Sequence, residues 1–226
     1  MHFKSKHSRL LFAVALLTAP LTIVGGAAAQ NATGGKTEQF EIEYLRFIID
    51  HHFSALRITE LAAGTDAQRN AEVTPNEGTA STPGFEHVRA KARLDELKSM
   101  ARKDNRMQRE EIMDAQRMLR EWYGIDHKPA LRPSGKRMIE MMEAAAPGEE
   151  FDRRFIEMLS QHHSMAIMPS TACQVNRKLE HQELGVYCRS VAESQIADVK
   201  QLRMLGCEKY GMCDLVPMDV SKELRQ

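Results

Sequence analysis

The chain carries one helical pattern twice. Within residues 44–58, apolar side chains and one histidine recur at intervals of three and four, which is the spacing of one face of a helix. Residues 155–166 repeat these intervals. The equivalent positions are Tyr44, Ile48, His51 and Ala55 in the first copy and Phe155, Leu159, His162 and Ala166 in the second. A chain built from two such copies is constrained to be largely helical.

A second amphipathic segment follows the first in each copy. We expect these helices to run from Phe85 to Tyr123 and from Leu179 to Leu205. Each copy is therefore a helical hairpin, and two hairpins would bury their apolar faces against each other as a four-helix bundle. The sequence shows no sustained alternation of β-branched and polar residues, which argues against a sheet.

The repeats define the expected domain organisation. Repeat one covers residues 38–124, a proline-containing connector covers 125–148, and repeat two covers 149–213, all within a single helical domain over 30–226. The polar loop at 65–84 has no counterpart in the second copy, and we expect it to be disordered. Pro169 is expected to kink or end the helix that contains it, because proline removes a backbone donor.

Residues 1–29 have the order of a secretory signal peptide. A basic start is followed by an uncharged apolar run and by a small-residue cleavage site at 27–29. We expect cleavage between Ala29 and Gln30, and a periplasmic or secreted mature protein. An uncleaved membrane anchor is the alternative, because no charge interrupts the apolar run. After cleavage, no remaining segment is apolar enough to span a bilayer.

The charge balance argues against a nucleic-acid partner. The chain has 31 basic and 31 acidic residues, and loss of the basic leader would leave the mature protein weakly acidic. Such a chain lacks the positive surface by which proteins bind nucleic acid.

The cysteines predict two disulfides, all in the second copy. An even number of cysteines in an exported chain is typical of paired thiols. Cys173 lies just before the second hairpin turn and Cys188 about two turns into the last helix, so they can face each other. Cys207 and Cys213 flank the end of that helix. We predict the pairs Cys173–Cys188 and Cys207–Cys213, with free buried thiols as the alternative.

Each copy places two adjacent histidines on or beside its apolar stripe. His51 and His162 lie in the middle of the stripes, and His52 and His163 lie on the flanking stripes. The inward face of a helix is at least about 100° wide, so both members of each pair can reach the interior or its margin. Buried imidazoles need partners, and imidazole suits copper, zinc, iron and nickel.

Nearby thioethers favour copper among these metals, because thioether ligands select copper, especially Cu(I). We therefore predict a protein that binds or buffers copper. The candidate ligands are His51, His52, His162 and His163, with Met165, Met168 and His181 as additional ones.

Other functions leave a different sequence pattern. The main alternative is a structural or interaction module of the cell envelope, with ordinary core histidines and methionines that fill gaps. A di-iron bundle would need Glu-x-x-His on its helices, and no glutamate stands three residues before any paired histidine. The sequence contains no phosphate-binding loop and no Gly-x-Ser-x-Gly motif, so it does not indicate an enzyme. A metal-dependent oxidoreductase is a third interpretation.

The histidine segments resemble a known family. FIIDHHFSALRITELAAGTD and FIEMLSQHHSMAIM, each followed by a helix start with Glu-Leu, resemble the domain-of-unknown-function family 305 over nearly all of residues 38–213. The resemblance implies an exported bacterial protein and, for some members, copper or silver handling. It also implies an all-α, ferritin-like four-helix bundle, here built from two repeated helical hairpins. The sequence leaves open whether the chain forms a homo-oligomer. His181 matches the family's usual histidine before Glu-Leu, whereas Leu94 stands there in the first copy.

Overall fold

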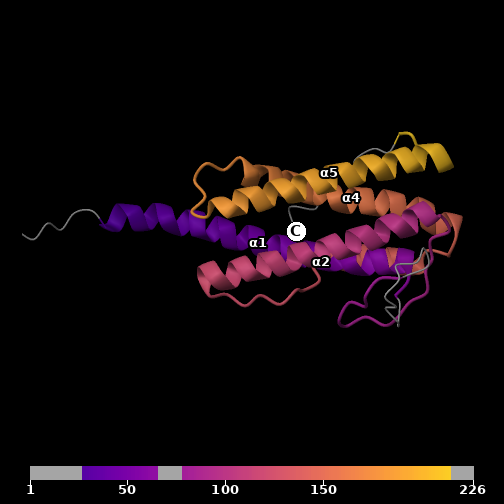
Figure 1. Ribbon diagram of the computed structural model, residues 1–226, viewed down its shortest axis with the longest axis horizontal. Helices are drawn as coiled ribbons and strands as arrows, with labels where there is room; N and C mark the ends of the chain where they lie inside the picture. The colour runs from indigo at the N-terminus through magenta and orange to yellow at the C-terminus, as the bar shows by residue number, and fades with distance from the viewer. Residues whose placement is uncertain (1–26, 66–77, 215–226) are drawn as a thin grey trace, which may run out of the picture.

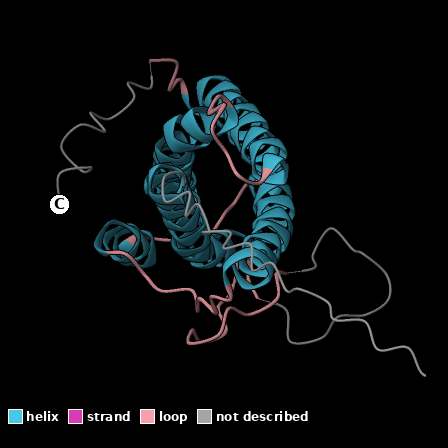
Figure 2. Cartoon of the chain, turned by 90° about the vertical axis from the view of Figure 1, so that its left-hand side faces the viewer, coloured by secondary structure: helices cyan, strands magenta, loops and turns pink. Residues whose placement is uncertain are grey.

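The computed structural model describes residues 27–65 and 78–214, with side chains from residue 35 onward. These residues form five helices and no strand, so the predicted all-α class is confirmed (Figure 2). The helices are α1 (Ala27–Ala63), α2 (Asp95–Tyr123), α3 (Pro133–Ala144), α4 (Glu149–Gln174) and α5 (Gln182–Tyr210).

The four long helices form two antiparallel hairpins that lie along each other (Figure 1). Helix α1 packs on α2, α4 packs on α5, and the hairpins meet through α1 and α4. In the first hairpin, Asn105 Nδ2 donates to the carbonyl of Leu56 at 3.0 Å, and Tyr123 Oη donates to Glu41 Oε2 at 2.5 Å. Residue numbers rise along one helix as they fall along the other, as the repeat predicts. The ferritin-like assignment stays a prediction.

The second hairpin is fastened by disulfides, and both predicted pairs are confirmed. Cys173–Cys188 joins α4 to α5 with a Cα–Cα distance of 5.9 Å, and Cys207–Cys213 joins the end of α5 to the segment after it at 4.3 Å. The first hairpin contains no cysteine. It is therefore held by noncovalent contacts alone, whereas the second is covalently closed near its turn.

A buried polar layer divides the apolar core along the helix axes. One apolar cluster is centred on Phe151 and Phe155, and the other on Leu45, Ile48 and Leu119; every long helix contributes to both clusters. Between the clusters each helix places polar side chains in the interior. They are His51 and His52 of α1, Asp104 and Gln108 of α2, His162 and His163 of α4, and Gln195 and Asp198 of α5. Burying so many polar groups is costly unless they find partners.

Helix α2 begins later than predicted. It starts at Asp95, whereas the sequence suggested a helix from Phe85. The segment before it runs along the end of α1, where the backbone N–H of Lys91 donates to the carbonyl of Leu61 at 2.9 Å. The last carbonyls of a helix have no partner within that helix. This segment supplies one, which explains why it remains extended.

The prediction of a disordered loop at 65–84 is wrong for its second part. Residues 66–77 lie outside the described residues, but 78–84 pack against the bundle. Thr82 Oγ1 donates to Glu60 Oε1 at 2.5 Å, and both side chains are buried. A fully buried carboxylate requires donors, and the loop provides one.

Pro169 lies inside α4, which continues to Gln174, so the helix does not end at the proline. Proline has no N–H for the carbonyl four residues earlier, that of Met165. Tertiary contacts hold the helix beyond this point: Ser170 Oγ lies 2.9 Å from Tyr44 Oη of α1, and the last turn carries a disulfide.

None of the described helices is both long and apolar enough to cross a membrane. Residues 1–26, which hold most of the predicted signal peptide, and residues 215–226 lie outside the described residues. Helix α1 begins at Ala27, within the predicted cleavage site and ahead of the expected start of repeat one. The two disulfides fit an exported protein, because thiols stay reduced in most intracellular compartments.

Candidate metal centre

His51 and His162 meet face to face between the two hairpins. Their ring centroids lie 3.8 Å apart and their planes are inclined by 20°. Ser54 Oγ donates to the carbonyl of His51 at 2.7 Å and lies 2.9 Å from His162 Nε2. Because the hydroxyl proton is already donated, Ser54 accepts from His162 Nε2–H. This leaves the lone pair on His162 Nδ1, and that nitrogen and His51 Nε2 are buried without a hydrogen-bond partner.

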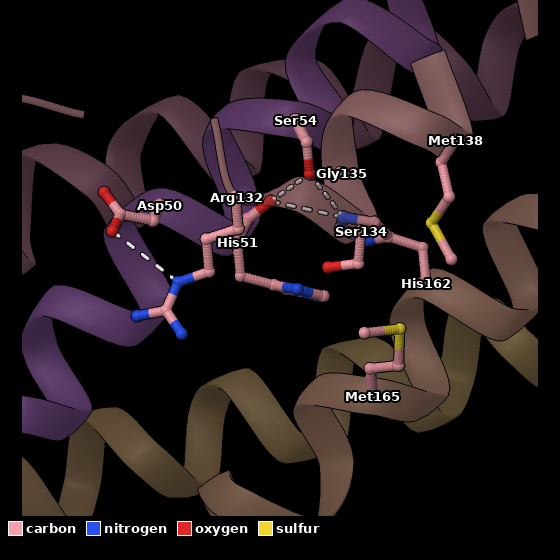
Figure 3. A pocket seen from close by; sticks show the side chains of 9 residues that line it. All are labelled: Asp50, His51, Ser54, Arg132, Ser134, Gly135, Met138, His162 and Met165. Atoms are coloured by element: carbon pink, nitrogen blue, oxygen red, sulfur yellow. Dashed lines mark hydrogen bonds and ion pairs between the residues drawn. The ribbon is translucent and has the colours of Figure 1, made fainter. Parts of the chain in front are cut away.

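A small pocket opens beside the stacked rings (Figure 3). Its volume is about 10 Å³, which is about the space of a single water. Met138 of α3 and Met165 of α4 line it together with His51 and His162. Two histidine and two methionine side chains thus line a space suited to one small ligand, and thioethers are soft donors that favour Cu(I).

Helix α3 and the connector before it cover this pocket. A Cβ added to Gly135 would stand 2.7 Å from Ser54 Cβ, so a glycine is needed for α3 to approach α1 this closely. Asp50, which precedes the first histidine pair, lies 2.8 Å from His127 Nε2 and 3.6 Å from the Arg132 guanidinium. Asp50 therefore holds the connector against α1 at the edge of the pocket (Figure 3).

His52 faces away from the pocket toward α2. Its Nε2 lies 2.9 Å from Glu111 Oε2. The His52 side chain is fully buried, whereas 14% of the Glu111 side chain is exposed. The buried His52 and the partly exposed Glu111 therefore share this side of the polar layer.

His163 occupies the equivalent place in the second half. Its Nε2 lies 3.3 Å from Gln108 Nε2. One potential ligand atom from each of Asp104, His163 and Asp198 lies within 4.8 Å of the other two, and all three residues are buried. Lys103 Nζ donates to Asp198 Oδ1 at 3.2 Å from the solvent side. Two carboxyl groups and an imidazole from three helices thus converge in the interior.

Burial controls the protonation of the polar layer. Burial, followed by repulsion from neighbouring imidazoles, lowers the pKa of His51, His162 and His163, that of His162 to about 3. Neutral imidazole is the form that coordinates metals, so these histidines are ready to bind at neutral pH. Burial raises the pKa of Asp104 and Asp198, and the charge of Asp198 raises that of Asp104 further.

The structure does not bring Met168 and His181 to the other predicted ligands. Met168 is 74% exposed, because it follows His162 by about one and two-thirds turns and so faces away from the interior. His181 lies at the start of α5, with Nδ1 2.8 Å from Glu41 Oε2 and its ring stacked on Trp122 at 4.1 Å. His181 therefore anchors one end of the bundle.

Several polar-layer and pocket residues were not recognised in the sequence. Glu111 and Asp198 occupy equivalent places in the two copies, next to the second histidine of each pair. The repeat was therefore a signal that could have found them. Asp104 lies on the inner face of its helix but has no acidic counterpart in the other copy. Met138 had no such signal, because α3 lies outside the repeat.

A protein-family model matches the chain and shows its family. The model described as "Domain of unknown function (DUF305)" matches residues 86–205, more than half of the sequence. The chain belongs to the DUF305 family. The membership confirms the resemblance suggested by the histidine segments, and the match includes the second histidine pair and the Asp104, His163 and Asp198 cluster.

The fold of this DUF305 protein is similar to solved structures of CopM. CopM in the Cu(I)-bound form is 23% identical over 76% of this chain and 98% of that chain, with a TM-score of 0.53. The Cu(II)-bound form is 20% identical over 75% and 97%, with a TM-score of 0.54. The apo form is 23% identical over 76% and 98%, with a TM-score of 0.51. At this level of identity the likeness establishes the fold. No curated protein sequence matches the chain.

Proposed function

We propose that this DUF305 protein is an exported copper-binding protein, with His51 and His162 as its primary ligands. The observation that carries the proposal is the pair of stacked imidazoles, each with an unpartnered buried nitrogen, beside two thioethers. Copper would be cargo that the protein binds or buffers.

The protonation and tautomer of the histidines support this proposal. The hydrogen bond from His162 Nε2–H to Ser54 leaves Nδ1 as the free donor. Met138 and Met165 supply soft sulfur, and both line the pocket. His52 and His163 lie directly behind the stacked pair, with ring centroids 5.8 Å from His51 and 6.1 Å from His162 respectively.

The related solved structures suggest which ions to test. CopM has been crystallised in Cu(I)-, Cu(II)- and Ag-bound forms. Cu(I) and Ag(I) are both soft ions that favour thioether and imidazole donors. They are therefore the appropriate probes for a pocket lined by two methionines and two histidines.

Replacement of the two pocket methionines by leucine provides the sharpest test. Met138→Leu/Met165→Leu nearly conserves volume and shape, so the fold should persist. We expect the double variant to bind Cu(I) more weakly than the wild type, by about tenfold or more. Leucine has no donor atom, and the remaining imidazoles do not replace the soft sulfur ligands. Competition with a calibrated Cu(I) chelator measures the affinity, and circular dichroism checks the fold.

Matched controls separate this proposal from the structural alternative. Met168→Leu changes an exposed methionine on the same helix, and His181→Gln changes a histidine that contacts Glu41 instead. Both controls should bind Cu(I) like the wild type. If the Met138/Met165 variant binds like the wild type, the methionines are not ligands and the methionine-lined pocket is not the copper site. If the wild type takes up no Cu(I), a structural module with core histidines is the better description.

A further inference from the structure

A second cluster of potential metal ligands lies outside the methionine-lined pocket. Asp104 of α2, His163 of α4 and Asp198 of α5 each offer one atom, and the three atoms lie within 4.8 Å of one another. None of the three residues lines the pocket beside His51 and His162. The exposed fractions of Asp104, His163 and Asp198 are 1%, 0% and 2%.

Several polar atoms in and beside this cluster lack partners. Neither carboxyl oxygen of Asp104 accepts a hydrogen bond from another residue, and His163 Nδ1 is also unpartnered. The side-chain carbonyls of Gln108 and Gln195, which belong to the same buried layer, are likewise unsatisfied. Buried polar groups in proteins are nearly always hydrogen-bonded or bound to an ion. A cation bound among these lone pairs would supply the partner that they lack.

We propose that Asp104, His163 and Asp198 form a second metal site, which binds a divalent cation of the zinc class. Two carboxylates and one imidazole are a nitrogen and oxygen donor set without sulfur. Such a set suits Zn²⁺ and other divalent ions of intermediate hardness, whereas Cu(I) prefers thioethers and thiolates. The inference does not depend on copper binding in the methionine-lined pocket.

The geometry requires only a small contraction to hold zinc. Zinc–ligand bonds to oxygen and nitrogen are about 2.0–2.2 Å long, so ligands at tetrahedral angles lie about 3.5 Å apart. Three long helices present the ligands, and rotation about the side-chain torsions of Asp104 and Asp198 can close the remaining distance. Zinc sites with three protein ligands leave a fourth position for water.

Gln108 can orient His163 for coordination. Its Nε2 lies 3.3 Å from His163 Nε2, and the oxygen and nitrogen of an amide exchange places when the group is flipped. After a flip, the Gln108 oxygen would accept the N–H of a His163 that coordinates through Nδ1. Metal-bound histidines generally donate their second ring N–H to such an acceptor. Gln108 is therefore assigned as a positioning residue for this site.

Lys103 is the natural competitor for the cation. Its Nζ lies 3.2 Å from Asp198 Oδ1, and half of the Lys103 side chain is exposed. The ammonium group thus offsets part of the negative charge of the cluster, and the flexible side chain can swing into solvent when a metal arrives. Removal of this positive charge should make zinc bind more tightly.

Zinc titration of the full mature chain, stripped with a chelator and free of copper, tests the inference. We expect about one high-affinity zinc ion per chain by calorimetry, and at least a tenfold loss of affinity in Asp104→Asn, since loss of one ligand oxygen leaves a weak site. Asparagine matches aspartate in shape and resembles its protonated form. Lys103→Gln should bind zinc several-fold more tightly than the wild type.

The matched control lies in the other half of the polar layer. Glu111→Gln removes the carboxylate beside His52, which is the repeat equivalent of Asp198, and leaves all three proposed ligands in place. This control should bind zinc like the wild type. Equal zinc binding by Asp104→Asn and the wild type, or no high-affinity zinc in the wild type, would overturn the inference.

Copper measurements keep this test separate from that of the proposed function. Asp104→Asn should retain Cu(I) binding, and Met138→Leu/Met165→Leu should retain zinc binding. If the methionine variant loses both ions, zinc enters the copper pocket and the second site is refuted. If Asp104→Asn does not fold, the Lys103→Gln affinity and the visible spectrum of bound Co²⁺ decide the matter. Wild-type-like zinc affinity in Lys103→Gln, or no nitrogen and oxygen coordination of Co²⁺, then refutes the site.

Discussion

The two hairpins place the same kinds of residue in the polar layer, but the side chains that surround His52 and His163 differ. In the first half, His52 lies beside Glu111, which still reaches solvent. In the second half, His163 lies in a fully buried cluster with Asp198 of α5 and with Asp104, which α2 of the first hairpin contributes. The repeat equivalent of Asp104 is Val191, which packs in an apolar cluster. One acidic residue thus turns a histidine–carboxylate contact into a three-ligand cluster.

The hairpins also differ in how they are held closed. The second hairpin has a short turn and a disulfide between α4 and α5. The first has a long turn whose described parts bond to the end of α1, through Lys91 and the carbonyl of Leu61 and through Thr82 and Glu60. Duplicated helices can therefore share a core while one half is stabilised covalently and the other by a packed loop.

Acidification should produce the largest effect, because the buried histidines take up protons less readily in the folded protein than in the unfolded chain. The pKa of His162 is lowered from 6.5 to about 3 in the folded protein, so the unfolded chain takes up the proton first. Metal-free protein should therefore lose stability as the pH falls from about 6.5 toward about 3, by several kcal/mol at about 1.4 kcal/mol per pKa unit. Urea denaturation at a series of pH values measures this loss. His162→Gln/His163→Gln should show a flatter dependence, and an unchanged slope would mean that these histidines do not control it.

Introduction of a carboxyl group at the repeat equivalent of Asp104 tests the asymmetry directly. Val191→Asp should destabilise the metal-free protein by about 3–5 kcal/mol, because it buries an uncompensated charge among apolar side chains. Thermal or urea unfolding measures the change, with Val191→Ala as the control for lost packing. A stability equal to that of Val191→Ala would show that the polar layer extends to this position.

Removal of the α4–α5 disulfide measures how much the second hairpin depends on it. Cys173→Ser/Cys188→Ser should cost about 3 kcal/mol in the free energy of unfolding, as expected for a loop closed by residues 15 apart. Cys207→Ser/Cys213→Ser removes a disulfide that joins residues only 6 apart and should cost less, about 2 kcal/mol. Urea denaturation under non-reducing conditions compares the two. The reverse order would show that native-state strain outweighs the chain-entropy effect.

Asp104→Asn should change stability in the opposite direction. In metal-free protein at neutral pH it should raise the free energy of unfolding by about 1–3 kcal/mol, because it removes a buried carboxyl group that lacks donors. The raised pKa of Asp104 implies that this carboxyl destabilises the fold as the pH rises through and above its unfolded value of 3.8. Glu111→Gln should change stability less, since Glu111 reaches solvent. A loss of stability in Asp104→Asn would mean that the carboxylate already has a partner.

Much of the candidate site was predictable from helical spacing. The position of His51 and His162 in the middle of their stripes placed them in the interior, and their repeated context predicted that they would meet. Helical spacing could also have excluded Met168 as a ligand, because Met168 does not lie on the same face of the helix as His162. The contribution of Met138 was not predictable, because α3 lies outside the repeat and its approach to α1 depends on Gly135.

The amino-acid sequence by itself determined the helices, the hairpin pairing, the disulfides and the burial of the paired histidines, because periodicity and cysteine spacing act along the chain. Only the tertiary structure decided which side chains complete the polar layer. Helix α2 begins at Asp95 because Asp152 of α4 accepts the backbone N–H of Leu94 at 3.2 Å. Both this contact and the meeting of Asp104 with His163 join one hairpin to the other. Such contacts depend on how one hairpin is rotated and shifted against the other, and no local pattern in the sequence specifies that register.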